Sequence, residues 1–193
     1  MSAVSLERVS KTYRRSWGRA ALLAVDDVSF AIAEGEAFGF IGANGAGKST
    51  TIKMLTGALQ PSAGTLQLLG HAVGDPESRR GLGYVPENPS LPDLLTPLEI
   101  LSMAMHLHGV KAADPRRHCL DWLARFSLAH VAAKPIRTFS KGMAQRVALA
   151  HAMVIRPRLL ILDEPLSGLD PIGRKEVVDI LEEYHRAGGT LFF

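Results

Sequence analysis

The sequence is poor in cysteine and has no long apolar run. Its one cysteine, Cys119, allows no disulfide within the chain, and the composition fits a reducing compartment. The start, "MSAVSLERVSKTY", lacks the apolar core of a signal peptide, and no window approaches the roughly 18 apolar residues that cross a bilayer. We therefore expect a chain that is soluble by itself, so that any membrane span would belong to another polypeptide.

Several chemical signals are also missing. The 22 basic and 19 acidic residues form no dense basic run, which argues against a nucleic-acid partner. The seven histidines are scattered, and His106 and His108 point to different sides of a helix, so we do not expect a zinc site. No Gly-x-Ser-x-Gly elbow suggests a serine hydrolase. With 47% hydrophobic and 21% charged residues in 193, the chain is typical of one globular domain with a sizeable core.

The order of expected elements is that of an α/β protein. Alternating apolar and polar residues from Val4 to Ala33, around a polar stretch from Arg14 to Arg19, predict a hairpin-like sheet. The apolar run "EAFGFIG" predicts a strand that leads through a glycine-rich loop into a helix from about Lys48 to Leu59. Two further short strands are expected at "GTLQLLG" and "GLGYV".

The second half begins with a proline-rich connector, "PENPSLPDLLTP". Helical spacing from Leu98 to Leu128 then predicts a helical insert, and another helix is expected to begin near Ser140. "RLLILD" predicts a buried parallel strand, "GRKEVVDILEEYHRAGG" an amphipathic helix, and "TLFF" a further strand. We expect an α/β fold with a mainly parallel sheet, an antiparallel N-terminal β subdomain and an inserted α-helical subdomain, divided at 1–86, 87–155 and 156–193.

The glycine-rich segment "GANGAGKST" matches G-x-x-x-x-G-K-[ST] between a strand and a helix, as a phosphate-binding loop requires. This phosphate loop comprises Gly42, Ala43, Asn44, Gly45, Ala46, Gly47, Lys48, Ser49 and Thr50. Backbone N–H groups would hold phosphates, Lys48 would reach the β and γ groups, and the Ser49 hydroxyl would ligate Mg²⁺. The alternative is a glycine-rich turn that only starts a helix.

Two acidic residues end the strand in "RLLILDEP". Asp163 is placed for the Mg²⁺ shell, and Glu164 stands where a carboxylate can polarise the attacking water. Alternatively, both acids only cap the following turn. The magnesium interpretation gains weight because a phosphate loop and an acid at a strand end are complementary halves of one site. These residues predict a phosphate-loop NTPase core that binds a nucleoside triphosphate with Mg²⁺, with Lys48 and Glu164 as the catalytic residues. Kinases, GTPases and many ATPases share such a loop, so it does not by itself specify ATP.

The segment "FSKGMAQR", residues 139–146, resembles the signature motif of ATP-binding cassette (ABC) proteins and precedes the acidic strand, as in that family. Ser140 and Gly142 match the common leucine-serine-glycine-glycine-glutamine form, whereas the neighbouring Phe139, Lys141 and Met143 depart from it. A serine that caps a helix would give the same local pattern. The order of the motifs within one compact cassette carries the resemblance over nearly the whole chain.

The resemblance implies further site residues. Tyr13 would stack on adenine, although a sheet aromatic would look the same in sequence. Glu87 stands where the family usually has glutamine, and it would face the metal or water through a carboxylate oxygen. "SGLD", which ends at Asp170, resembles the loop that contacts the partner cassette. In this family Ser140 and Gly142 act on the nucleotide of the opposite chain.

The segments "FSKGM", "PENP" and "LTPLEIL…LHG" resemble single-cassette ATPases of exporters. The resemblance implies a homodimer or paired cassette that hydrolyses ATP on the cytoplasmic face of the membrane and drives a separate permease. Leu91, Leu94 and Leu95 would either receive a permease helix or close the core of the insert. The alternatives are a soluble non-transport cassette ATPase and a nucleotide-binding module with little turnover.

After a strand such as "TLFF" the family has a switch histidine, and no residue here can be assigned to it; His185 precedes that strand. The resemblance therefore predicts a chain truncated before its switch. Such a chain would bind ATP through Lys48 and Ser49, yet hydrolyse it slowly and fold less stably.

Overall fold

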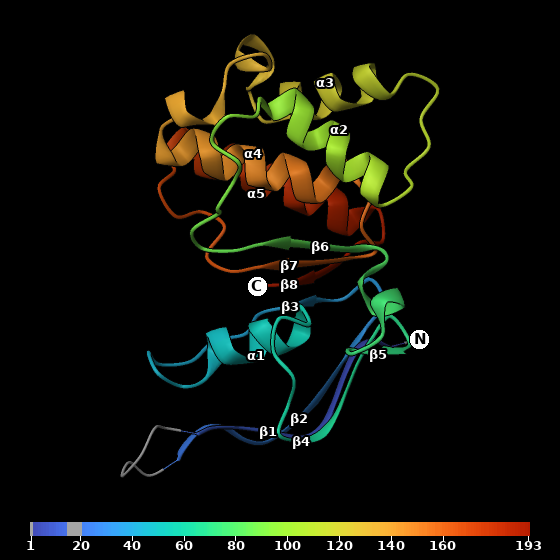
Figure 1. The fold of residues 1–193 in the computed structure, drawn as a ribbon, viewed down its shortest axis with the longest axis vertical. Helices are drawn as coiled ribbons and strands as arrows, with labels where there is room; N and C mark the ends of the chain where they lie inside the picture. Colours follow the sequence, from blue (N-terminus) through green and yellow to red (C-terminus); the bar gives the residue numbers. More distant parts are fainter. Residues whose placement is uncertain (1, 15–20) are drawn as a thin grey trace.

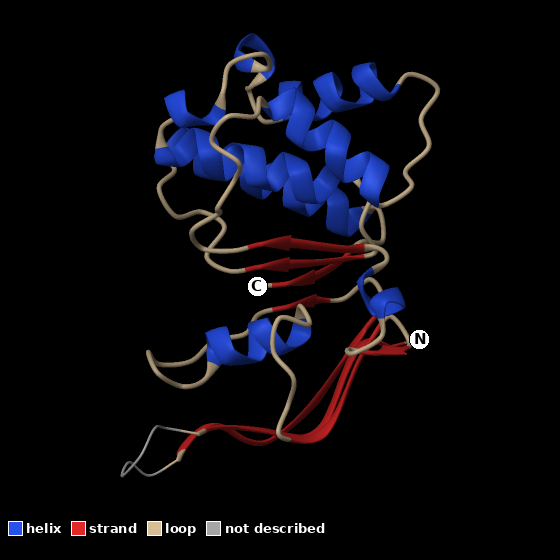
Figure 2. Ribbon diagram, in the orientation of Figure 1, coloured by secondary structure: helices blue, strands red, loops and turns tan. Residues whose placement is uncertain are grey.

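The computed structural model describes residues 2–14 and 21–193, which form two four-stranded sheets and the helices that pack on them (Figure 1). Most of the expected polar stretch from Arg14 to Arg19 lies outside the described residues. Helices cover one face of the parallel sheet, while the antiparallel sheet and a single α-helix lie on the side of its other face (Figure 2). The predicted α/β class is confirmed.

The antiparallel sheet has the order β2-β1-β4-β5. Its strands are β1 (Ser2–Tyr13), β2 (Leu22–Ala33), β4 (Ala63–Leu68) and β5 (His71–Ala72). β1 pairs with β2 from Ser2↔Ala33 to Tyr13↔Leu22, so the expected hairpin-like pairing is confirmed. This pairing brings Tyr13 beside the first residues of β2.

The parallel sheet has the order β3-β8-β7-β6. Its strands are β3 (Ala37–Phe38), β8 (Thr190–Phe192), β7 (Leu159–Leu162) and β6 (Leu82–Val85). All four residues of β7 are buried, because successive side chains enter opposite cores: Leu160 and Leu162 pack among the helices, whereas Leu159 and Ile161 pack on the side of α1 (Lys48–Leu55) and the antiparallel sheet. This double burial explains the uninterrupted apolar run in the sequence.

The remaining α-helices are α2 (Pro97–Leu107), α3 (Pro115–Arg125), α4 (Lys141–Val154) and α5 (Pro171–Arg186). Short 3₁₀ turns lie at Pro76–Arg79, Ala129–Val131 and Ile136–Thr138. Each of these helices begins with proline in its first turn or with a capping side chain. At α2, Thr96 and Glu99 form a capping box. None of the described helices is both long and apolar enough to cross a membrane.

Two predicted elements are longer than the observed ones. "EAFGFIG" forms a strand over two residues only, because β3 is an edge strand whose sole sheet neighbour is the three-residue β8. The helix expected to reach Leu59 ends at Leu55, because Gly57 takes the left-handed conformation (φ 74°) that closes helices. Neither difference moves the phosphate loop.

The leucines of the connector separate into two groups. Leu91 and Leu95 are partly buried and pack against the helical core, so they help to close the insert. Leu94 is 77% exposed and is free of that packing. Of the three, only Leu94 keeps the surface position that contact with another protein would need.

Candidate functional site

A cavity of about 490 Å³ lies at the carboxyl ends of the parallel strands. The phosphate loop follows β3, Glu87 follows β6, and Asp163 and Glu164 follow β7, so the sheet brings three distant segments together. The residues that line the cavity are Tyr13, Leu22, Leu23, Ala24, Ala43, Asn44, Gly45, Gly47, Lys48, Ser49, Thr50, Glu87, Asp163 and Glu164. Gly42 and Ala46 belong to the same loop but do not line it. The motifs that the sequence analysis interprets as parts of one site therefore line one cavity.

The phosphate loop presents its backbone N–H groups outward. Within the part of the chain that the structure describes, the N–H groups of Gly45, Gly47, Lys48, Ser49 and their loop neighbours donate to no backbone carbonyl, apart from Ala46, which donates to the Ala43 carbonyl. Helix α1 starts at Lys48 with no side-chain cap and no acidic residue in its first turn. An uncapped helix start beneath free N–H groups is suited to an anion.

Gly47 explains why the loop can form. Its φ is 93°, and a Cβ atom there would lie 2.4 Å from the carbonyl oxygen of Ala24 on β2. Only glycine fits that approach of the loop to the neighbouring strand. Lys48 Nζ donates to the carbonyls of Gly42 and Ala43, the latter at 3.1 Å, which holds the ammonium group over the loop.

Three carboxylates border the cavity opposite the loop. Burial raises the pKa of Asp163, and the negative charges of Glu87 and Glu164 raise it further, while Lys48 opposes the rise. Glu164 has φ 49°, a left-handed conformation that turns the chain directly after β7. Clustered acids that repel one another are a favourable place for a cation.

The donor set fits magnesium better than a metal held by protein side chains alone. Among residues 2–14 and 21–193, no group of three or more His, Cys, Asp or Glu side chains is arranged to hold a metal ion. Magnesium usually takes one or two carboxylates and leaves its other positions to substrate phosphates and water. Ser49, Asp163 and Glu87 all line the cavity and match that sparse pattern.

Three residues assigned from the family resemblance, two in the signature segment and one in "SGLD", lie outside this cavity. Ser140 caps α4 by accepting a hydrogen bond from the Met143 N–H, and it borders another depression beside residues 88–91. Gly142 lies so close to the carbonyl of Gly168 that a Cβ atom would be 2.8 Å from it. Asp170 caps α5 and lies 3.8 Å from Arg146. Within its own chain, Ser140 therefore makes the contact expected of a helix cap.

Sequence reasoning missed several residues of the site. Leu22, Leu23 and Ala24 line the cavity beside Tyr13, and the exposure of Leu22 (43%) and Leu23 (51%) marks an apolar wall. Gln145 on α4 is fully buried and donates from Nε2 to the Pro165 carbonyl at 3.2 Å, which holds the turn after the acidic pair. The sequence signal that could have indicated a role for Gln145 is its position as a polar residue on the apolar face of α4.

Comparison with known families now identifies the chain. The family described as "ABC transporter" matches residues 25–167. The chain belongs to the ABC transporter family. The resemblance drawn from the phosphate loop, the signature segment and the acidic strand is thereby confirmed.

Named relatives within the ABC transporter family cover almost all of this chain. An uncharacterized ABC transporter ATP-binding protein of Nostoc is 39% identical over the whole chain and YxlF of Bacillus subtilis 40% over 98% of it. The doxorubicin resistance ATP-binding protein DrrA of Mycobacterium tuberculosis is 33% identical over 96%. The chain spans 58%, 61% and 56% of the length of these curated relatives, respectively.

Solved ABC structures have the same fold. A dimeric post-hydrolysis state of the cassette MJ0796, bound to ADP and Pi, superposes with a TM-score of 0.89 at 26% identity, covering 98% of this chain and 86% of that one. An ATP-binding subunit of an ABC transporter superposes with a TM-score of 0.88 at 33% identity, covering 98% of this chain and 78% of that one. The arrangement of this ABC chain is therefore that of an ATP-binding cassette.

Proposed function

We propose that this chain is the ATP-binding and ATP-hydrolysing part of a transporter that exports its substrate through a separate integral-membrane permease. The observation that carries the proposal is the single cavity in which the outward N–H groups of the phosphate loop, Lys48 and three carboxylates meet. Membership of the family and the printed names of relatives such as DrrA support a transporter rather than another use of the same loop.

In the proposed complex the loop N–H groups and the start of α1 bind the phosphates. Lys48 exchanges its loop carbonyls for the β and γ phosphate oxygens, a short movement because its ammonium group already lies over the loop. Ser49, Asp163 and Glu87 hold Mg²⁺, which neutralises charge on the phosphate oxygens when it is bound. Tyr13 receives the adenine, and the neighbouring Leu22 and Leu23 extend that apolar surface.

Glu164 is proposed to orient the attacking water and to accept its proton. It lines the cavity next to Asp163, and its left-handed backbone turns the chain out of β7 at this point. A carboxylate one residue beyond a metal ligand can contact water beside the γ-phosphate without taking the metal position itself. Glu87 adds a second negative charge where glutamine is usual, which should raise the local affinity for the metal.

The proposed active unit is a pair of cassettes, either a homodimer or two related chains. Ser140, Gly142 and Asp170 lie outside the cavity of their own chain, as expected for residues that contact the nucleotide of a partner. ATP would close the pair and hydrolysis would open it. We propose the cytoplasmic face of the membrane as its location, the exposed Leu94 as a permease contact, and no nucleic-acid partner.

We also propose the division of the chain into 1–86, 87–155 and 156–193. The two hydrophobic cores support it: one gathers most of the first segment, and the other gathers the helices of the second. The last segment belongs to both cores through β7 and β8. Movement of the middle segment against the sheet would carry the ATP cycle to the permease.

The proposal is tested by ATP binding and hydrolysis with Mg²⁺. Lys48→Ala should abolish ATP binding, whereas Lys175→Ala, which removes an exposed lysine on α5, should leave it unchanged. Tight ATP binding by Lys48→Ala would refute the phosphate-loop assignment. Both substitutions remove one positive charge, but only Lys48→Ala removes it from the cavity.

Glu164→Gln tests the chemical role separately. It should keep ATP binding, reduce turnover by about a hundredfold or more, and favour the closed pair. Glu182→Gln on the surface of α5 is the matched control, because Glu182 pairs with Arg186 and does not line the cavity. Unchanged turnover in Glu164→Gln would refute the assignment of Glu164 as the residue that orients the attacking water. ATP binding without any turnover in the unaltered chain would instead favour a nucleotide-binding module.

A further inference from the structure

A second cavity, of about 370 Å³, lies at the opposite end of the parallel sheet. Pro157 and Arg158 precede β7, Thr190 begins β8, and Glu34 precedes β3, so the cavity faces the amino ends of the strands. It shares no lining residue with the phosphate-loop cavity. Its size falls within the usual range for small-molecule sites.

Three helices end at this second cavity. α3 contributes Trp122 and Arg125, and α4 contributes Met153, with Arg156 just after its last turn. From α5 and the residue that follows it come Ile180, Glu183, Tyr184 and Ala187. The apolar part of the wall comes from Trp122, Met153, Pro157, Ile180 and the ring of Tyr184. The walls thus join the helical insert to the sheet, with apolar surface and a few charged groups.

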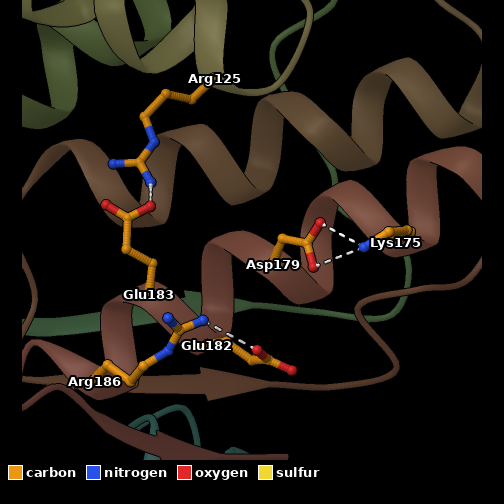
Figure 3. Close-up of polar contacts among 6 residues, drawn as sticks. All are labelled: Arg125, Lys175, Asp179, Glu182, Glu183 and Arg186. Atoms are coloured by element: carbon orange, nitrogen blue, oxygen red, sulfur yellow. Dashed lines mark hydrogen bonds and ion pairs between the residues drawn. The ribbon is translucent and has the colours of Figure 1, made fainter.

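Most charged groups around the second cavity already have partners. Arg125 reaches from α3 to Glu183 on α5 (Figure 3). It also stacks over Trp122, with its Cζ atom 4.8 Å from the ring centroid. Arg158 pairs with Glu34 at 3.0 Å. Both acidic residues of the wall are therefore neutralised by arginine.

Arg156 is the exception. Across residues 2–14 and 21–193, the exposed side chain of Arg156 has neither a hydrogen bond nor an ion pair, although the residue borders the cavity. Its backbone is left-handed (φ 54°), an unfavourable conformation for an L-residue, at a position where glycine often ends a helix. One unpaired positive charge therefore remains beside an apolar wall.

We propose that this second cavity binds a small organic monoanion, an apolar body with one carboxylate, which pairs with Arg156. A guanidinium fork binds a carboxylate through two parallel hydrogen bonds, and the apolar body would be removed from water by the wall. No unpaired acid among the described lining residues would receive a cation instead. The site is independent of the proposed ATPase activity.

A structural role gives the competing explanation. Arginines near helix C-termini interact favourably with the negative end of the helix dipole, and three helices end here. That role accounts for positive charge but requires no cavity and no ligand. The two explanations differ in whether an organic carboxylate binds and whether Arg156 is needed for it.

Isothermal titration calorimetry with 1-naphthoate, without ATP, tests the proposal. We expect a dissociation constant of about 1 mM or lower, and binding at least about tenfold weaker for 1-naphthalenemethanol, which keeps the ring but lacks the charge. Arg156→Gln should weaken naphthoate binding by about tenfold or more. Because ATP is omitted, failure of the proposed ATPase function would not affect this result.

Arg186→Gln is the matched control. It removes the same charge, from the last residue of α5, but Arg186 pairs with Glu182 at 3.2 Å and does not line the cavity (Figure 3). It should leave naphthoate binding unchanged. Absence of binding up to about 5 mM, equal affinity for the uncharged alcohol, or equal losses in the two arginine variants would each overturn the proposal.

Discussion

Gly45 and Gly47 of the phosphate loop have the same kind of backbone but different surroundings. Their φ angles are 83° and 93°, so an alanine at either position would adopt an unfavourable left-handed conformation. A Cβ atom at Gly45 meets nothing within 4 Å, whereas one at Gly47 would lie 2.4 Å from the Ala24 carbonyl oxygen and 3.1 Å from Val25. The two substitutions therefore separate the cost of conformation from the cost of a close approach.

The structure gives the expected magnitudes. Gly45→Ala should lower the free energy of unfolding by about 1–2 kcal/mol, which is the cost of a left-handed L-residue. For Gly47→Ala, ordinary contact begins at 3.4 Å, so the loop and β2 must separate by about 1 Å. A displacement of packed backbone adds about 1–3 kcal/mol, for a total of about 2–5 kcal/mol. ATP affinity should also fall more in Gly47→Ala, because the displaced N–H groups no longer converge.

The measurement is urea unfolding of both variants and the unaltered chain, followed by circular dichroism. The linear slope with urea should stay constant, so that the shift of midpoint reports stability alone. If the two variants lose the same free energy within about 0.5 kcal/mol, the approach of Ala24 to Gly47 does not constrain the loop, and the reasoning fails.

Two further substitutions test features outside the loop. Gln145→Ala should lower the free energy of unfolding by about 2–3 kcal/mol, because it leaves a small cavity and deprives the Pro165 carbonyl of its donor; an unchanged thermal midpoint would contradict this. Hydrogen bonds from the Thr96 backbone and hydroxyl lower the pKa of Glu99 below its ordinary 4.5. Its stabilisation is therefore present above that pH and is lost as the pH falls through the folded-state pKa. Glu99→Gln should flatten the acid side of the stability curve measured by urea unfolding, and a curve parallel to that of the unaltered chain would count against the capping box.

The parts of the site that follow strands were predictable from local sequence. Glycine spacing located the phosphate loop, and an apolar run ending in two acids located Asp163 and Glu164, because both patterns are set by neighbouring residues. Parallel strands then bring such segments to one edge of a sheet. The structure places these residues around one cavity as expected.

Other features depend on contacts between distant segments. Leu22 and Leu23 line the cavity because β1 and β2 pair in a particular register, which local alternation does not specify. The burial of Gln145 depends on where the turn at Pro165 passes over α4. The second cavity exists because three helix ends meet, and the sequence around Arg156 shows no motif for it.

The pairing of β3 with β8 has a consequence for synthesis of the protein. Gly35, just before β3, donates to the hydroxyl of Thr190, 155 positions later in the chain, and Phe38 and Phe40 pack on Phe192 with ring centroids 5.9 and 5.4 Å apart. A nascent chain therefore displays these phenylalanines until Phe192, their partner, has been made. Such late, non-local closure folds slowly and exposes apolar surface to other chains. The strand that leads into the phosphate loop therefore keeps an uncovered apolar surface until β8 has been made.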